Sequence, residues 1–430
     1  MSATETVYEA LTNDQGARLC RDIPDEACRE EPRSFVFILL SNGFTQLGDA
    51  LASPKTTLAW LTALVGAPAL ILGLIVPVRE SGSMIPQIFV GGAIRRLPVR
   101  KWVWVAGSVG QAACVAGLAL VAFTLTGNSA GWAILGLVVL FSLCRGFCSV
   151  AAKDVMGKTI PKERRGRLSG WSASAAGLLS VGIGLTLLLP VTGSPGTVLL
   201  GMLLLLAAVL WLLAAVVYAR IKEHPGETDG GRGIRDALGT FSLLVSDAPF
   251  RRFVITRALM TCSALSAPFY IALAQQSLGT GAAILGVFIV AAGLASLLSG
   301  PFWGRFADVS SRRVMLYSAL ITSVVGGLTL VVHRWFGELT QSVWFLPVAY
   351  FVLSVAHNGV RVGRKTYVVN LASGNQRTDY VAISNTVIGV LLLFIGSVGA
   401  LAPIIGNDGV LGVLALMGLA GAALATTLPE

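Results

Sequence analysis

Apolar segments of roughly 20 residues recur along almost the whole chain and are separated by short polar connections. A helix of that length spans about 30 Å, which is the thickness of the hydrocarbon core of a bilayer. Hydrophobic residues make up 54% of the 430 residues and charged residues only 13%, a balance more apolar than a soluble domain requires. A transmembrane barrel would show shorter, alternating segments. The sequence therefore predicts an all-α membrane protein.

The net charge of +10 is distributed in a way that indicates membrane orientation. Lysine and arginine cluster in every second connection between apolar segments, for example in "RRLPVRK" (95–101), "KTIPKERRGR" (158–167) and "RVGRK" (361–365). The intervening connections lack them, except that Arg334 falls in a predicted outer loop. This positive-inside pattern predicts a multi-pass protein of the plasma membrane, the inner membrane in a bacterium, with both termini in the cytoplasm. The charge is then explained by orientation, and nucleic acid is not expected as a partner.

Two weak internal repeats divide the chain into halves. "GGAIRRLPVRK" (91–101) aligns with "GRFADVSSRRV" (304–314), and "KDVMGKTIPKERRGRLSG" (153–170) aligns with "KTYVVNLASGNQRTDYVA" (365–382). Both pairs lie at equivalent joints between apolar segments, which predicts two pseudo-symmetric six-helix bundles. The expected organisation is a cytoplasmic tail (1–34), a first bundle (35–220), a cytoplasmic linker (221–249) and a second bundle (250–430).

The stretch "RESGS" (79–83) could be either a loop or a charged pair within a span. As a loop, it would leave only the apolar stretch "MIPQIFVGGAI" to cross a core that needs about 20 residues. We therefore expect Arg79 and Glu80 within the membrane. Adjacent residues of a helix point about 100° apart, so the two should contact other helices rather than each other. One of them is expected to reach Asp49 or Lys55, and Glu80 is expected to have Lys55 or an arginine within hydrogen-bonding distance.

Twelve spans follow from these boundaries. They are expected at approximately 35–59, 68–94, 102–126, 131–156, 168–190, 197–220, 251–276, 281–305, 314–333, 343–366, 380–403 and 409–427. Pro54 is expected to kink the first span near its outer end, because proline removes a backbone hydrogen bond.

The loop after the second span of the second half reads "GRFADVSSRR" (304–313). It resembles the signature of the major facilitator superfamily, in which Gly, Asp and paired basic residues follow at fixed spacing, and "PKERRGR" (161–167) is similar to the family as well. The resemblance covers essentially the whole chain through the twelve spans and the six-plus-six repeat. It implies two bundles that rock about a site near the bilayer midplane, lined mainly by spans 1, 4, 7 and 10. The fifth span lacks the Gly-Pro pairs of the family's antiporters, which weakens a drug-efflux interpretation.

Charged side chains at membrane depth are costly and therefore face partners, water or solute. Arg145 lies on a polar stripe of span 4, and the repeat places His357 and Arg361 on the equivalent stripe of span 10. The expected solute-binding residues are Asn42, Gln46, Lys55, Arg79, Arg145, His357 and Arg361. Asp49 and Glu80 are the only acids deep in the predicted spans and are the candidates for proton coupling. The alternative for these charges is a set of structural ion pairs that lock helices together.

The function expected from this pattern is secondary active transport by alternating access. No Walker motif, nucleophile–base constellation or metal-ligand spacing is visible, so neither an enzyme nor a metal nor a cofactor is expected. The intramembrane set holds four basic groups against two acids, which favours a small anionic or carboxylate-bearing solute, with protons as a candidate coupling ion. We expect a monomer in the lipid bilayer. The alternative is a non-transporting receptor or assembly factor that keeps the same fold.

Four charges in the cytoplasmic connections are expected to form a gate. Arg95 aligns with Asp308, and Arg167 aligns with Asp379, so both positions reverse sign between the halves. In the family that the chain resembles, the loop after the second span of one half approaches the fifth span of the other. This implies the pairs Asp308–Arg167 and Arg95–Asp379, although Arg95 departs from the family's usual Asp and could instead be one more positive-inside anchor.

Overall fold

The computed structural model describes residues 8, 28–86, 94, 96–161, 168, 172, 177–188, 196–225, 228, 240–371 and 376–429. Within these ranges the chain is almost entirely helical, and eight helices are long and apolar enough to cross a membrane. The expected all-α membrane fold is confirmed, and the arrangement is consistent with the twelve predicted spans. The residue boundaries of the four predicted segments stay predictions.

The described part of the first half is built mainly from six helices. They are α3 (Glu31–Leu51), α4 (Thr57–Leu64), α5 (Ala69–Met84), α7 (Lys101–Thr124), α8 (Gly127–Thr159) and α10 (Thr197–Ala219). A further apolar helix, Gly177–Thr186, lies within the predicted fifth span. The predicted first span is interrupted at residues 52–56, around Pro54, and continues as α4, so the expected kink is a complete break.

The second half begins after a short connection made of η2 (Thr240–Ser242) and α12 (Leu243–Ser246). Its helices are α13 (Ala248–Leu259), α14 (Cys262–Leu265), α15 (Ala267–Leu278), α16 (Ala282–Val309), α17 (Ser311–Trp335), α18 (Gly337–Thr340), α19 (Phe345–Leu371), α20 (Gln376–Gly396), η3 (Ser397–Leu401) and α21 (Ala402–Ala425). The predicted seventh span, 251–276, was expected to be continuous but is divided into α13, α14 and α15. Pro268 at the start of α15 contributes to the division, because it has no N–H for the helical ladder.

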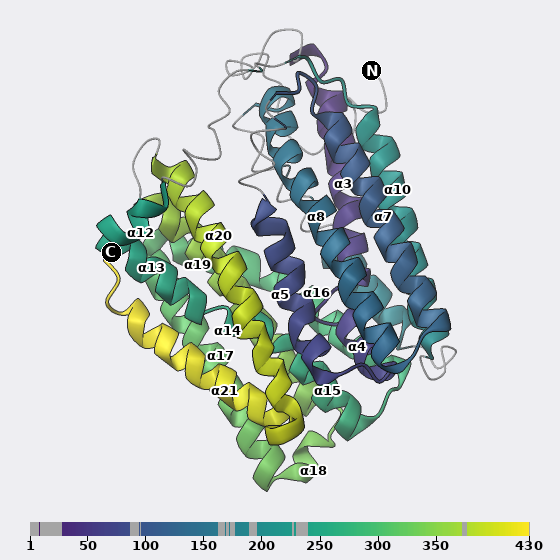
Figure 1. Ribbon diagram of the computed structural model, residues 1–430, viewed down its shortest axis with the longest axis vertical. Helices are drawn as coiled ribbons and strands as arrows, with labels where there is room; N and C mark the ends of the chain where they lie inside the picture. The colour runs from purple at the N-terminus through teal and green to yellow at the C-terminus, as the bar shows by residue number, and fades with distance from the viewer. Residues whose placement is uncertain are drawn as a thin grey trace.

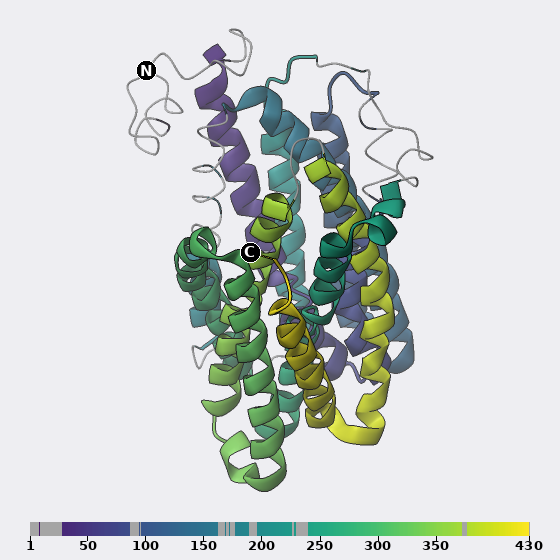
Figure 2. The same ribbon diagram turned by 90° about the vertical axis from the view of Figure 1, so that its left-hand side faces the viewer.

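The two halves lie side by side, with α5 and α20 packed against each other between them (Figure 1). We call the end of the molecule at which α3 begins and α21 ends the near end. The opposite end, at which α4, α15 and α18 lie, is called the far end (Figure 1). The view turned by 90° shows the long helices running roughly along one direction between these ends (Figure 2). At the far end, Gln275 Nε2 donates to the carbonyl oxygen of Trp60 at 3.1 Å, which links α15 to α4.

Glycines allow the helices of the two halves to approach closely. A Cβ added to Gly73 of α5 would lie 2.7 Å from the Cα of Gly399, which follows α20. A Cβ added to Gly184, in the short helix Gly177–Thr186, would lie 2.8 Å from the backbone nitrogen of Val290 in α16. The contacts thus occur at equivalent helix pairs, α5 with α20 and Gly177–Thr186 with α16. Small residues at such crossings let backbones pack against each other within a membrane.

Candidate functional site

A cavity of about 660 Å³ lies between the two halves. Its lining comes mainly from α3, α8, α16 and α19, with further residues from the break between α3 and α4. It contains all the predicted solute-binding residues except Arg79: Asn42, Gln46, Lys55, Arg145, His357 and Arg361. Asp49 lines it as well. The predicted spans 4 and 10, which correspond to α8 and α19, therefore both line one cavity with residues of their polar stripes.

Asp49 lies between two arginines. Arg79 Nη2 is 2.9 Å from Asp49 Oδ1, and Arg145 Nη1 is 2.7 Å from the same oxygen and 2.5 Å from Oδ2. The Arg79 guanidinium also lies over the Phe141 ring, 4.3 Å from its centroid. The expected contact from the second span to the first is thereby confirmed as Arg79–Asp49. One carboxylate shared by two guanidinium groups leaves a net positive charge at this wall of the cavity.

Among the described residues, Glu80 lacks the close basic partner that we expected. The residue lies in α5, so the question raised by "RESGS" is answered in favour of a helix. Among the described residues, however, no ion pair or hydrogen bond joins the Glu80 side chain to Lys55 or to an arginine. Lys55, Arg79, Arg361 and Arg364 act on its carboxylate only through their charges. The physical reason is direction, because adjacent residues of a helix point about 100° apart and Arg79 is the one that points to Asp49.

Lys55 contacts His357 across the cavity. Lys55 Nζ is 2.7 Å from His357 Nε2, and His357 Nδ1 is 3.1 Å from Ser263 Oγ. The Tyr350 hydroxyl donates to the carbonyl oxygen of Lys55 at 3.3 Å. The break between α3 and α4 is thus tied to α14 and α19 of the other half.

Arg361 has no acid partner among the residues that the structure describes. It is an exposed residue of α19 and lines the cavity together with His357. An uncompensated guanidinium in a cavity is a binding group for an anion, because it presents a fork of N–H donors that matches a carboxylate.

Sequence reasoning missed Arg257 and Arg364. Arg257 of α13 is 6% exposed and donates to Ser384 Oγ and Asn385 Oδ1 of α20, each at 2.8 Å. Arg364 lies one turn beyond Arg361 on α19. Both are arginines inside predicted spans, at 251–276 and 343–366, so the signal that flagged Arg145 was available for them too.

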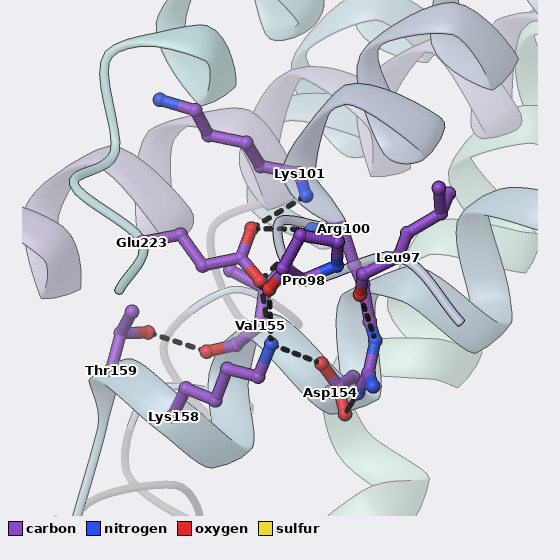
Figure 3. Close-up of polar contacts among 9 residues, drawn as sticks. All are labelled: Leu97, Pro98, Arg100, Lys101, Asp154, Val155, Lys158, Thr159 and Glu223. Atoms are coloured by element: carbon purple, nitrogen blue, oxygen red, sulfur yellow. Dashed lines mark hydrogen bonds and ion pairs between the residues drawn. The ribbon is translucent and has the colours of Figure 1, made fainter. Parts of the chain in front are cut away.

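A second polar cluster was also missed and lies in the first half at the near end (Figure 3). The fully buried Glu223 carboxylate accepts from the backbone nitrogens of Arg100 and Lys101, at 2.8 and 2.6 Å, and from Lys158 Nζ at 2.9 Å. Asp154 pairs with Arg100 and with Lys158. Glu223 thus satisfies the N–H groups at the start of α7, where a negative charge is favourable. No local motif indicates this contact, because Glu223 lies more than one hundred residues from Arg100 and Lys101 in the sequence.

The predicted cytoplasmic gate lies largely outside the described part of the chain. Arg95 and Arg167 are outside the described residues. Asp308 lies in α16 and Asp379 in α20, where the structure describes their backbone. The two gate pairs therefore stay predictions.

Comparison with known proteins identifies the fold of the chain and the family that its second half matches. Residues 259–430 match the family model of the Major Facilitator Superfamily. No curated protein matches the chain by sequence. Among solved structures, the nucleoside transporter NupG is similar over 92% of this chain and 98% of its own, with a TM-score of 0.69 and 12% identity. A D-xylose-proton symporter is similar over 92% and 98%, with a TM-score of 0.67 and 13% identity.

A POT family transporter in complex with 5-aminolevulinic acid is similar over 95% of this chain and 98% of its own, with a TM-score of 0.69 and 11% identity. Identities this low establish the fold and leave the transported solute open. The match of the second half and the fold of the whole agree with the signature at 304–313. The second half thus matches the Major Facilitator Superfamily by sequence, and the chain as a whole has the fold of these solved transporters.

Proposed function

We propose that the protein is a secondary active transporter for a small solute that carries a carboxylate or another anionic group. The observation that supports this most strongly is the charge of the central cavity. Lys55, Arg145 and Arg361 line it, and Asp49 is the one acid among its described lining residues. Asp49 is already occupied by two arginines, which leaves Arg361 to bind an anion.

The size of the cavity supports a small molecule as the cargo. Ligand sites in proteins typically enclose about 300–1,000 Å³, and this cavity of about 660 Å³ lies within that range. Asn42, Gln46 and the serines of its lining would supply hydrogen bonds to the polar remainder of the solute. Proton coupling belongs to the proposal. Glu80, which has no close ion pair among the described residues, is better placed than Asp49 to exchange a proton.

The test is transport and binding with a defined panel of anions. Purified protein is screened for thermal stabilisation by monocarboxylates, dicarboxylates and matched neutral analogues, and each stabilising compound is then followed as a radiolabelled solute in proteoliposomes. We expect stabilisation and uptake for carboxylates, and loss of both in Arg361→Gln. Arg312→Gln is the control, because Arg312 contacts the backbone carbonyl of Leu428 at the near end and lies outside the cavity.

Absence of stabilisation and of uptake across the panel would contradict the proposal and favour the alternative, a receptor or assembly factor with the same fold. Stabilisation by neutral analogues that survives Arg361→Gln would leave transport standing and remove the anionic solute.

We also propose that the protein is a monomer of the bacterial inner membrane with both termini in the cytoplasm. The support for the orientation is the positive-inside distribution of lysine and arginine. Fusions of a fluorescent protein and of alkaline phosphatase to the C-terminus test the orientation, and light scattering in detergent tests the oligomeric state. Activity of the phosphatase fusion would place the C-terminus outside the cytoplasm and contradict the proposed topology.

A further inference from the structure

The contact between Lys55 and His357 joins the two halves at the cavity. Lys55 lies in the break between α3 and α4, and His357 lies on α19, 2.7 Å away from nitrogen to nitrogen. Both residues line the cavity. The neighbouring bonds, Tyr350 to the Lys55 carbonyl and Gln275 to the Trp60 carbonyl, also run between the halves on the far side. The Lys55–His357 contact is therefore one of three side-chain contacts that join the halves towards the far end.

The hydrogen bonds around His357 determine where its proton lies. A lysine ammonium has three donors and no acceptor, so His357 Nε2 must accept from it and the imidazole must be neutral. The ring proton is then on Nδ1 and donates to Ser263 Oγ at 3.1 Å. The Ser263 hydroxyl in turn donates to the Met260 carbonyl oxygen at 3.0 Å.

The other neutral tautomer does not satisfy this chain. With the proton on Nε2, His357 Nδ1 and the Met260 carbonyl oxygen would compete for the single Ser263 hydroxyl proton. The first arrangement gives each ring nitrogen one partner and leaves the Ser263 hydroxyl proton for the Met260 carbonyl oxygen.

A protonated His357 is incompatible with the contact. The imidazolium has no lone pair to accept from Lys55, and two cations would lie 2.7 Å apart. The charged groups around the pair do not relieve this repulsion. Arg361 and Arg364 of α19 act on both members, and Arg79 and Glu80 of α5 act on Lys55, of which Glu80 is the one acid and makes no close ion pair.

The remaining titratable neighbours are neutral or already engaged. Cys262 of α14 is a buried free thiol next to Ser263, and Tyr350 of α19 donates its hydroxyl to the Lys55 carbonyl. Asp49 of α3 is bound by Arg79 and Arg145. None of the described groups supplies a carboxylate in contact with His357.

We propose that Lys55 and His357 form a proton-linked contact that couples closure of the far end to the release of one proton. When the far end is open, Lys55 and His357 separate and His357 binds a proton at Nε2. When the far end closes, the Nε2–H bond breaks, the proton passes to water in the cavity, and a Lys55 N–H donates to the freed lone pair. The Nδ1 proton stays in place throughout.

This inference rests on the proposed transport function and assigns to His357 a proton that is exchanged when the far end opens and closes. The proton is taken up while the far end is open and is discharged into a cavity that the far end no longer connects to the outside. A solute bound in the same open state would travel with it, in the same direction.

The experiment measures the far end directly and without any solute. Spin labels at Ser129→Cys and Glu338→Cys, two exposed positions of the far end in opposite halves, report its width by electron–electron double resonance. We expect the long-distance population to increase several-fold as the pH falls from about 8.5 to 5.5, the range in which histidine titrates. A distance distribution that is the same at all pH values overturns the proposal.

His357→Gln is the central variant. A glutamine amide can accept from Lys55 and donate to Ser263 without titrating, so the short distance should persist at every pH. His333→Gln is the matched control, since His333 lies on α17 outside the cavity, and it should retain the full pH response. Retention of the pH response in His357→Gln also overturns the proposal.

Lys55→Met guards against a folding defect in His357→Gln. Without the lysine, no N–H group needs the lone pair of His357 Nε2, so closure no longer requires His357 to lose its proton. The distances between the two labels should then be independent of pH and favour the open state. The distance measurements separate this inference from the proposed function. A pH-dependent far end that transports no anion would refute transport alone, and transport with a pH-independent far end would refute the coupling alone.

Discussion

Asp49 is the residue on which the charge balance of the first half depends. It is the acid that compensates Arg79, which is 9% exposed and lies within α5. A buried guanidinium without a partner is far more costly than the pair, because the desolvation of the charge is no longer offset. The role of Asp49 as a structural counter-ion and its predicted role in proton coupling make different demands, since its carboxylate already accepts from two arginines.

Asp49→Asn should therefore destabilise the protein strongly. Breaking a buried pair costs about 3–5 kcal/mol, so we expect a decrease of several degrees in the Tm of purified protein. Replacing the guanidinium as well, in Asp49→Asn/Arg79→Met, should recover much of the loss, because no unpaired charge remains at that position. Glu30→Gln removes the exposed pair with Lys222 and serves as the control, with an expected cost of about 0–1 kcal/mol. A double variant as unstable as the single one would contradict the pairing argument.

At the scale of the element, the start of α3 carries a pH-sensitive group. Glu31 is the first residue of that helix and is buried, and its carboxylate accepts from the Tyr8 hydroxyl at 2.8 Å. Burial raises the pKa of Glu31 from 4.5 to about 7. Because the pKa is raised on folding, the folded state binds a proton that the unfolded state has lost between these two values. Its contribution is fully present below pH 4.5 and is lost as the pH rises to about 7.

The Tm should accordingly decrease between pH 4.5 and 7 through Glu31. In Glu31→Gln the amide remains neutral and still accepts from Tyr8, so this part of the decrease should disappear. The measurement is the difference in Tm between the two proteins across the pH range, which removes the groups that both share. A constant difference would show that the Glu31 carboxylate titrates equally in the folded and unfolded states.

The helices also show how far the sequence determines the structure. The apolar periodicity located α7 and α10 within a few residues, because an uninterrupted apolar helix has no competing signal. The division of the seventh span into α13, α14 and α15 was not predicted. Pro268 is its one signal in the sequence, and the effect of a proline depends on how the neighbouring helices pack. The Arg79–Asp49 pair followed from charge complementarity between adjacent spans. Glu223 could not be anticipated, because its partners come together only when α7, α8 and the end of α10 are in place.

At the scale of the whole molecule, the halves are held together by backbone-to-backbone approach. Ser81 of α5 donates to the carbonyl oxygen of Gly389 in α20 at 2.6 Å, and Gly73 faces Gly396 and Gly399 further along the same helix pair. Such a contact has no spare volume, so it fits one relative placement of the helices. If the halves move during transport, the close contact between α5 and α20 must either be kept or be replaced by another contact.

Gly73→Ala should therefore disturb the relation between the halves. Its Cβ would lie 2.7 Å from the Gly399 Cα and 2.8 Å from the Gly396 carbonyl oxygen, and neither backbone atom can rotate away. We expect a lower Tm and a changed distance between the labels at Ser129 and Glu338. Gly43→Ala is the matched control, because nothing lies within 4 Å of its added Cβ, and it should leave both measurements unchanged. Equal behaviour of the two variants would show that the α5–α20 contact is loosely packed.

The predicted gate at the near end belongs to the same scale, because it would connect the two halves. Asp379→Arg should impair transport by repelling Arg95, and Arg95→Asp should restore it in the double variant. The expected effect is on the balance between conformations, since an exposed pair contributes only about 0–1 kcal/mol. Additive losses without rescue in the proteoliposome assay would mean that the gate pair does not form.

The buried contact of Glu223 has a consequence for how the polypeptide could be divided. Glu223 fixes the chain to the first half, and Asp247 fixes it again at the second half, where it accepts from Phe250 N at 3.0 Å and from the Tyr380 hydroxyl. Each of these contacts is made within one half, so neither depends on a bond to the other half. The two halves should therefore reassemble when they are synthesised as separate fragments, cut within 226–239, and co-purify as a non-covalent heterodimer that is functionally complemented.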